Sequence, residues 1–257
     1  MKITLITGAS SGMGLEYARQ LAAKGNDLLI VSNQQEQLIE ATSMLVEEYG
    51  VNVIPRYLDL AKEDAAQQLY DYCKEQDYEV DTLICNAGMF FFKEMHPEIE
   101  PRISTMLNLH VTTNTRLCLL FGEDMKNRRG GHILIVSSLA AVLPMPGITL
   151  YAATKAYLKS FGRSLYFEMR PYGVSVTTVC PAAVATPLYN LKPSLMDFAV
   201  KIGVIWTPQR LVRLALKAMY RKRRLYSPGF MNLWMPAVIA LLPKSLVNAI
   251  WKRLNKE

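Results

Sequence analysis

The sequence predicts one α/β domain in which a parallel sheet of about seven strands carries helices on both faces. Short apolar runs alternate with segments of helical periodicity along most of the 257 residues. The strand candidates are continuous apolar runs, which indicates burial on both faces of a parallel sheet. No repeat, low-complexity stretch or Pro/Gly/Ser-rich linker divides the chain, so a single doubly wound domain is the simplest interpretation.

The expected elements alternate in chain order. Apolar runs predict strands at 3–7, 28–31, 51–57, 82–85, 132–136 and 175–180, with a short seventh strand after the basic run 221–224. Helical periodicity predicts helices at 12–24, 36–49, around 69–72, 101–128 and 151–172. Ligands of a doubly wound sheet bind beyond the carboxyl ends of its strands, so the loops that follow the strands are where we expect a site.

Charge and cysteine content narrow the possible functions. The net charge of +7 is concentrated in the last quarter, where twelve Lys and Arg from Lys201 onward accompany one acidic residue. No motif interleaves basic and aromatic side chains, so we expect no nucleic-acid partner. The four cysteines form no C-x-x-C pair and the three histidines are dispersed, so we expect no disulfides and no metal site. With no signal-peptide pattern at the start, a cytoplasmic location is expected.

A glycine-rich turn follows the first expected strand and opens the first expected helix. In the segment T-G-A-S-S-G-M-G, glycines stand at positions 8, 12 and 14. Glycines permit a tight turn and a close approach of the backbone to a ligand, and the free N–H groups of a helix start favour a pyrophosphate. Because strand and helix flank the turn in the required order, it predicts a dinucleotide site.

Four motifs in one order identify a family. The G-x-x-x-G-x-G turn is followed by N-A-G at 86–88, by Ser138 thirteen residues before Tyr151, and by Y-A-A-T-K at 151–155. This set resembles the short-chain dehydrogenase/reductase (SDR) family, and more loosely its lipid- and steroid-type carbonyl reductases. The motifs span about residues 3–190. The resemblance implies a Rossmann-type fold, with 1–190 as the dinucleotide-binding and catalytic core and 191–257 as the substrate lid and basic C-terminal segment of the same domain.

The resemblance also implies which residues hold the dinucleotide. The glycine turn would line its phosphates, Asp59 and Leu60 its adenine ring, and the segment from Pro181 to Thr186 its carboxamide. The implied set is Gly8, Ser10, Ser11, Gly12, Met13, Gly14, Ser32, Asn33, Asp59, Leu60, Asn86, Ala87, Gly88, Tyr151, Lys155, Pro181, Val184 and Thr186.

The end of the second strand decides between NAD and NADP. A carboxylate there would bind the ribose 2′-hydroxyl and repel a 2′-phosphate. This chain has Ser32 and Asn33 instead, and both side chains can donate hydrogen bonds to a phosphate. No Arg or Lys stands nearby, since Ser11 occupies the turn position where relatives often carry a basic residue. The pattern favours NADP over NAD.

Tyr151, Lys155 and Ser138 are the expected reacting groups. Tyr151 and Lys155 are four residues apart and therefore share one helix face. A nearby ammonium and the positive nicotinamide lower the pKa of a phenol from about 10 toward the working range. In the ketone reduction that the resemblance implies, Tyr151 would protonate the carbonyl oxygen and Lys155 would hold the ribose. Ser138, chosen over Ser137 by its spacing from Tyr151, would stabilise the developing alkoxide.

One position departs from the family pattern. Relatives carry an asparagine in the long helix before the fifth strand, where it supports a water that connects the active-site lysine to solvent. Here His110 aligns with it, whereas Asn108 lies two residues early. Either His110 holds that water through a ring nitrogen, or it is only structural. The catalytic set is therefore Ser138, Tyr151 and Lys155, with His110 as a further candidate.

The last third of the chain bears on substrate and partners. Residues 187–206 are apolar, with Met196, Phe198 and Trp206 as pocket candidates or as ordinary core residues. We expect a lipophilic ketone such as 3-ketosphinganine, a 3-oxoacyl thioester or a steroid; the alternative function is a non-catalytic nucleotide-sensing regulator. Residues 230–257 are basic and amphipathic, which suits peripheral contact with an anionic membrane, a dimer interface or self-packing. The resemblance implies a homodimer or homotetramer.

Overall fold

The computed structural model describes residues 1–142, 146–182, 184 and 206–228, and contains the predicted parallel sheet. Seven strands lie in the order β3-β2-β1-β4-β5-β6-β7, and every neighbouring pair is parallel. The strands are β1 (Lys2–Thr7), β2 (Leu28–Ser32), β3 (Val53–Tyr57), β4 (Glu79–Cys85), β5 (Gly131–Val136), β6 (Val174–Val179) and β7 (Leu225–Tyr226). The strand order reverses between β1 and β4, as in a doubly wound sheet, and confirms the predicted fold class.

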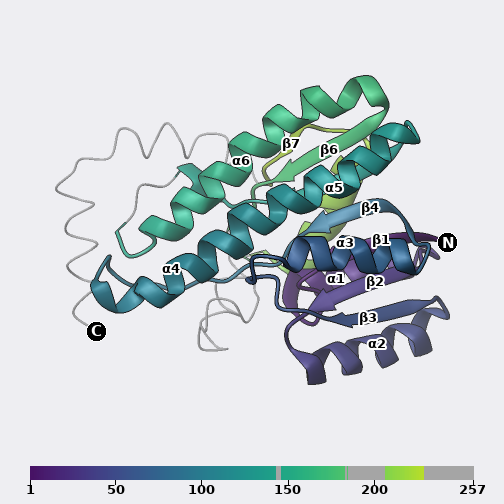
Figure 1. Cartoon of the computed structure of the whole chain (residues 1–257), viewed down its shortest axis with the longest axis horizontal. Helices are drawn as coiled ribbons and strands as arrows, with labels where there is room; N and C mark the ends of the chain where they lie inside the picture. The colour runs from purple at the N-terminus through teal and green to yellow at the C-terminus, as the bar shows by residue number, and fades with distance from the viewer. Residues whose placement is uncertain (143–145, 183, 185–205, 229–257) are drawn as a thin grey trace.

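Helices cover both faces of this sheet (Figure 1). Side chains of α3, α5 and α6 pack on one face, and side chains of α1, α2 and α8 pack on the other. The helices are α1 (Gly12–Ala22), α2 (Gln35–Tyr49), α3 (Ala65–Glu75), α4 (Glu100–Leu107), α5 (Thr113–Asn127), α6 (Thr149–Met169) and α8 (Pro208–Tyr220). Short helical turns are η1 (Pro97–Ile99), η2 (Asn108–Thr112), η3 (Leu139–Val142) and η4 (Arg170–Tyr172).

Strand β3 departs from the predicted burial on both faces. Its side chains are half-buried or exposed because it lies at the edge of the sheet and pairs with β2 alone. An edge strand also tolerates Pro55, which has no N–H to donate. The strand begins at Val53, two residues later than predicted.

The predicted helix 101–128 is interrupted. Helices α4 and α5 are separated by a π-helical turn, η2, at Asn108–Thr112. Nδ2 of Asn114 donates to the carbonyl oxygens of Leu109 and His110, at 3.0 and 2.9 Å. These bonds satisfy the carbonyl groups that the widened turn leaves without a helical partner. Such π-helical turns are frequent at functional sites. The turn places the side chain of His110 fully inside the protein.

Helix α8 was not predicted, although the sequence carries its signals. Thr207 accepts a hydrogen bond from the backbone N–H of Arg210 and caps the helix, and Pro208 follows at its first turn. The buried side chains repeat at helical spacing: Leu211, Val212, Ala215, Leu216, Ala218 and Met219. The helix packs beside α1 on the second face of the sheet.

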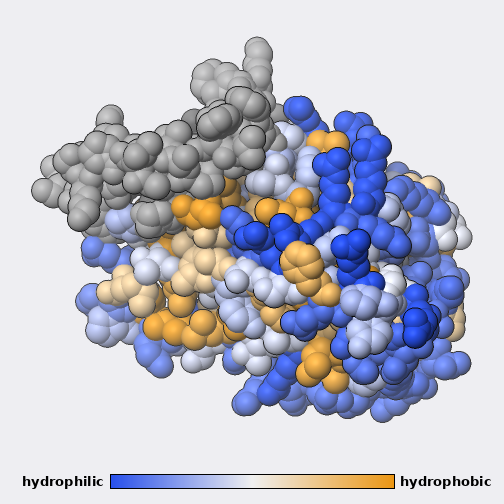
Figure 2. All heavy atoms as spheres, turned by 90° about the horizontal axis from the view of Figure 1, so that it is seen from above, coloured by the Kyte–Doolittle hydropathy of each residue, from blue (hydrophilic) through white to orange (hydrophobic). Residues whose placement is uncertain are grey.

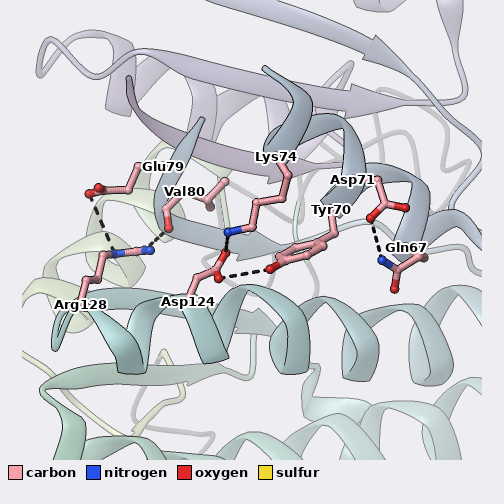
Figure 3. A network of polar contacts seen from close by, with 8 residues as sticks. All are labelled: Gln67, Tyr70, Asp71, Lys74, Glu79, Val80, Asp124 and Arg128. Atoms are coloured by element: carbon pink, nitrogen blue, oxygen red, sulfur yellow. Dashed lines mark hydrogen bonds and ion pairs between the residues drawn. The ribbon is translucent and has the colours of Figure 1, made fainter. Parts of the chain in front are cut away.

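A polar network joins α3 to α5 over the first face (Figure 3). The carboxylate of Asp124 accepts from Nζ of Lys74 at 2.8 Å and from the hydroxyl of Tyr70 at 3.2 Å. Beside it, Arg128 donates to the carbonyl oxygen of Val80 and lies 4.0 Å from the carboxylate of Glu79. These bonds hold α5 in register with β4, whose end carries part of the site described below.

Several predictions concern residues outside the described ranges: Thr186, the pocket candidates Met196 and Phe198, and the segment 230–257. The boundary at residue 190 also lies there, and the division into core and lid stays a prediction. None of the helices within the described ranges combines the length and the apolarity needed to cross a membrane.

Helix α6 approaches β6 closely at Gly162. A Cβ at this position would overlap Oγ1 of Thr178 and lie 3.1 Å from Cδ1 of Ile135. We expect Gly162→Ala to lower the free energy of unfolding by about 1–2 kcal/mol, because the overlap outweighs the gain of about 1 kcal/mol in helix propensity. Urea unfolding measures this, with Gly130→Ala as the control, since a Cβ there meets nothing within 4 Å. Equal stability of the two variants would contradict the close approach.

Candidate active site

A cleft of about 660 Å³ opens beyond the carboxyl ends of the strands, where the sequence places it. Most of the predicted site residues line it, from the glycine turn to Lys155. The lining residues are Gly8, Ser10, Ser11, Gly12, Met13, Ser32, Asn33, Gln34, Gln37, Asp59, Ala61, Asn86, Ala87, Gly88, Met89, Phe90, Thr105, Leu109, Val136, Ser137, Ser138, Tyr151, Lys155, Pro181, Ala182 and Val184.

The glycine turn lies directly against the segment that follows β4. Gly8 has φ +66°, and a Cβ there would lie 2.8 Å from Cα of Ala87. Gly14 does not line the cleft; a Cβ on it would overlap the carbonyl oxygen of Gly8. Gly12 also has a positive φ, of 55°. Only glycine permits this conformation and this spacing at low cost, so the turn presents bare backbone to the cleft.

Asn86 connects the ends of β1 and β4. Its Nδ2 donates to the carbonyl oxygens of Thr7 and Gly8, at 3.1 and 3.2 Å. The Thr7 hydroxyl accepts from the backbone N–H groups of Asn86 and Ala87, each at 3.0 Å. The Oδ1 atom of Asn86 is buried and has no partner among the described residues. Asn86 therefore braces the sheet at the ends of β1 and β4.

The end of β2 carries the side chains expected to choose between NAD and NADP. Oγ of Ser32 lies 2.8 Å from Oγ of Ser10 and accepts from the backbone N–H of Gln34 at 3.1 Å. Ser32 is buried and ties the glycine turn to β2. Asn33, Gln34 and Gln37 line the cleft beside it. The amide of Asn33 is thus better placed than the Ser32 hydroxyl to meet a ligand.

Asp59 and Leu60 take different places. Asp59 lines the cleft, and its carboxylate accepts from the backbone N–H of Ala61 at 3.1 Å. Leu60 points into the core, and its carbonyl oxygen accepts from the buried Thr113 hydroxyl at 2.8 Å. Ala61, which is not among the predicted residues, lines the cleft instead.

Lys155 lies at the base of the cleft, and its side chain is almost completely buried. Its Nζ donates to the carbonyl oxygen of Val136 at 3.1 Å and lies 5.6 Å from the centre of the Tyr151 ring. Burial lowers the pKa of this amine from 10.5 to about 8, because desolvation disfavours the charged form. An amine in this position can donate a hydrogen bond to a ligand hydroxyl, and its positive charge can lower the pKa of the neighbouring phenol.

The two serines after β5 differ in what their hydroxyls do. Oγ of Ser137 donates to the carbonyl oxygen of Lys155 at 2.7 Å, which fixes α6 against β5. Oγ of Ser138 accepts from the backbone N–H of Ala140 at 3.1 Å. Because Ser138 accepts in this bond, its own hydrogen stays available to a ligand oxygen. The geometry agrees with the choice of Ser138 by spacing.

Apolar side chains surround Tyr151. The ring of Phe90 lies edge-on to it, with centroids 5.0 Å apart. Met106, Ala140 and Ile148 form a buried cluster with Tyr151. Met89, Phe90, Phe91, Leu150 and Ala152 pack against this cluster. The part formed by 89–91 was not predicted, although the apolar run directly after N-A-G is a signal for it.

His110 lies outside the cleft lining and has protein partners at both ring nitrogens. The backbone N–H of Met89 donates to its Nε2 at 2.9 Å, and its Nδ1 lies 2.8 Å from Oγ1 of Thr154. Burial, and secondarily the charge of Lys155, hold its pKa well below the usual range. Of the two alternatives, this arrangement favours a structural position over a ring nitrogen that holds water.

Behind β6, Pro181 and Val184 line the cleft as expected, and Trp206 pairs with Val184 in a short parallel bridge. The backbone N–H of Leu139 donates to the carbonyl oxygen of Pro181 at 2.7 Å, which joins this segment to the one bearing Ser138.

The features of the cleft together fit a dinucleotide: a backbone cradle that a Cβ would fill, a buried amine, and the orphaned Oδ1 of Asn86.

Known proteins resemble this chain in sequence and in architecture. The family model of the short chain dehydrogenases matches residues 2–194. The very-long-chain 3-oxoacyl-CoA reductase of Homo sapiens is 28% identical over 98% of this chain and 79% of its own length. That of Anas platyrhynchos is 27% identical over 98% of this chain and 80% of its own.

Solved structures agree. A short-chain dehydrogenase from Sphingobium yanoikuyae in complex with NADPH superposes with a TM-score of 0.80, at 25% identity over 95% of this chain and 97% of that one. The bulky-bulky ketone specific alcohol dehydrogenase from Comamonas testosteroni gives a TM-score of 0.78 at 25% identity, over 95% and 96% of the two chains. The chain belongs to the short-chain dehydrogenase family of NAD(P)-dependent oxidoreductases.

Proposed function

We propose that the chain uses NADPH to reduce the keto group of a long-chain 3-oxoacyl thioester. The observation that carries this proposal is the apolar cluster around Tyr151, because its members Met89 and Phe90 line the reacting end of the cleft and suit an acyl chain. On the face shown in Figure 2, apolar side chains gather toward the left, the end at which the strands finish in Figure 1. The curated relatives named as 3-oxoacyl-CoA reductases support the same substrate class.

The proposed chemistry assigns one task to each polar group at the base of the cleft. NADPH, when bound, would supply a hydride to the carbonyl carbon. The Tyr151 hydroxyl gives its proton to the carbonyl oxygen, which completes the alcohol. The Ser138 hydroxyl donates a hydrogen bond to that oxygen as negative charge develops on it.

Lys155 has two tasks in this proposal. Its ammonium holds ribose hydroxyls of the dinucleotide, and its charge favours the phenolate that Tyr151 becomes after proton transfer. With a pKa of about 8, the Lys155 amine is still mostly protonated at neutral pH and therefore carries the charge that this role needs. Gly8, Ser10, Ser11, Gly12 and Met13 cradle the phosphates in the proposed complex.

Replacing Tyr151 by phenylalanine tests the reaction. We expect Tyr151→Phe to lose about 100-fold or more in kcat, because it removes the proton donor and leaves the ring packing in place. NADPH oxidation at 340 nm measures this against a long-chain 3-oxoacyl thioester, 3-ketosphinganine and a steroid ketone. NADPH binding, followed by fluorescence, is the control and should change little.

If the wild type turns over none of these ketones but still binds NADPH, the chain is a nucleotide sensor and not a reductase. If it prefers the steroid or 3-ketosphinganine, the proposed substrate is wrong while the proposed chemistry stands.

The cofactor proposal is tested at Asn33. We expect Asn33→Asp to weaken NADPH binding about tenfold and NADH binding little, because the new carboxylate repels only the 2′-phosphate. Asn127→Asp adds the same charge at the exposed end of α5 and is the matched control. An equal effect of Asn33→Asp on both dinucleotides would contradict a 2′-phosphate at this position.

Three further proposals concern assembly and location. The chain forms a homodimer or homotetramer, which the large exposed side chains of Leu119 on α5 and Phe167 on α6 support. It works in the cytoplasm, which four free, buried cysteines support. Residues 230–257 contact an anionic membrane, which their basic amphipathic sequence supports. A monomer mass in light scattering would contradict the proposed oligomer. A chain that stays in the supernatant when anionic vesicles are sedimented would contradict the membrane contact.

A further inference from the structure

The buried ring of His110 connects two parts of the site that lie far apart in the sequence. A backbone N–H can only donate, so the bond from Met89 requires Nε2 of His110 to be the accepting nitrogen without hydrogen. The neutral ring then carries its hydrogen on Nδ1, which donates to Oγ1 of Thr154 at 2.8 Å. Oγ1 of Thr154 in turn donates to the carbonyl oxygen of Tyr151 at 2.8 Å.

Every donor and acceptor in this chain of bonds has one assignment. His110 is fully buried and Thr154 nearly so, which removes water as a competing partner. Burial and the charge of Lys155 keep the ring neutral, because they hold the pKa of His110 well below its usual range. A low dielectric strengthens such bonds and makes the loss of one partner costly.

The His110 ring is also packed tightly against the segment 88–90, which follows β4. A Cβ on Gly88 would lie 3.1 Å from Nε2 of His110, so the ring rests directly against the backbone there. Two residues on, Phe90 lies edge-on to Tyr151, at an interplanar angle of 90°. The segment 88–90 and the first two turns of α6 are therefore joined twice, through His110 and through the rings of Phe90 and Tyr151.

We propose that His110 and Thr154 are positioning residues, which set Tyr151 and Phe90 relative to each other and so fix the hydroxyl of Tyr151 at the wall of the substrate cleft. The catalytic consequence of this positioning, which is the alignment of the phenol with a ketone, rests on the proposed function. Thr154 is the informative member, because its hydroxyl links the imidazole to the backbone of Tyr151, whereas the His110 ring also lies edge-on to the Tyr151 ring, with centroids 5.8 Å apart.

Variants of Thr154 test the proposal through turnover. Thr154→Val keeps the side-chain shape and removes the hydroxyl, and we expect kcat for the ketone that the wild type accepts best to fall about five- to tenfold. Thr154→Ser keeps the hydroxyl and should restore kcat to within about twofold of wild type. NADPH affinity should be unchanged, since neither Thr154 nor His110 lines the cleft.

Thr42→Val on α2 is the matched control. The Thr42 hydroxyl donates to the carbonyl oxygen of Leu38 in the same helical manner, away from the site. Its loss should leave kcat unchanged and lower Tm less than Thr154→Val does, because one hydrogen bond is lost at a half-buried site and no buried donor loses its partner. The proposal is overturned if Thr154→Val keeps the wild-type kcat, or if Thr154→Ser is as slow as Thr154→Val.

A readout without substrate separates this inference from the proposed function. Nitrogen-15 shifts of the His110 ring should report the tautomer with hydrogen on Nδ1 in the wild type. Hydrogen on Nε2 would overturn the bridge whether or not any ketone is reduced. If the expected tautomer is found and no ketone is turned over, the proposed function fails and the bridge stands.

Discussion

The site depends on an amine that the fold removes from water. Lys155 is buried beneath the cleft with the carbonyl oxygen of Val136 as its hydrogen-bond acceptor. A shift of its pKa from 10.5 to about 8 corresponds to roughly 3 kcal/mol against the charged form. The unfolded chain holds this proton between pH 8 and 10.5 whereas the native protein does not, so stability from this group rises with pH across that window. A ligand that gives the buried ammonium new hydrogen-bond partners therefore stabilises the folded protein.

The surrounding structure explains how Lys155 stays in place. Gly162 lets α6 lie close to β6, and the Ser137 hydroxyl holds the carbonyl group of Lys155 itself. On the other side, Asn86 ties the end of β4 to the glycine turn. Hence the amine and the phenol on α6 are held against the strand ends that carry the backbone cradle.

Much of this could be predicted from the sequence, because parallel strands bring their carboxyl ends to one edge. The glycine turn, the N-A-G segment and Ser138 each follow a strand end, so their order along the chain predicts one shared edge, whereas Tyr151 and Lys155 lie on α6 and were expected in the cleft from the family resemblance. The fold class follows from the same alternation and is confirmed.

Other features depend on contacts between distant segments and could not be predicted. The partners of His110 lie 21 and 44 residues away, and the π turn that buries its ring leaves no signal in helical periodicity. Leu60 turned into the core because Thr113 holds its carbonyl group. Helix α8 is a different case, since its cap and apolar face were present in the sequence and were overlooked.

The pH dependence of NADPH binding tests the role of Lys155 most directly. If the ammonium holds the dinucleotide, binding must raise its pKa above the free value of about 8, so the affinity should be constant below pH 8 and fall as the pH rises beyond it. Lys155→Met should bind more weakly and show no such fall. The same profile in both proteins would mean that the buried amine does not hold the dinucleotide.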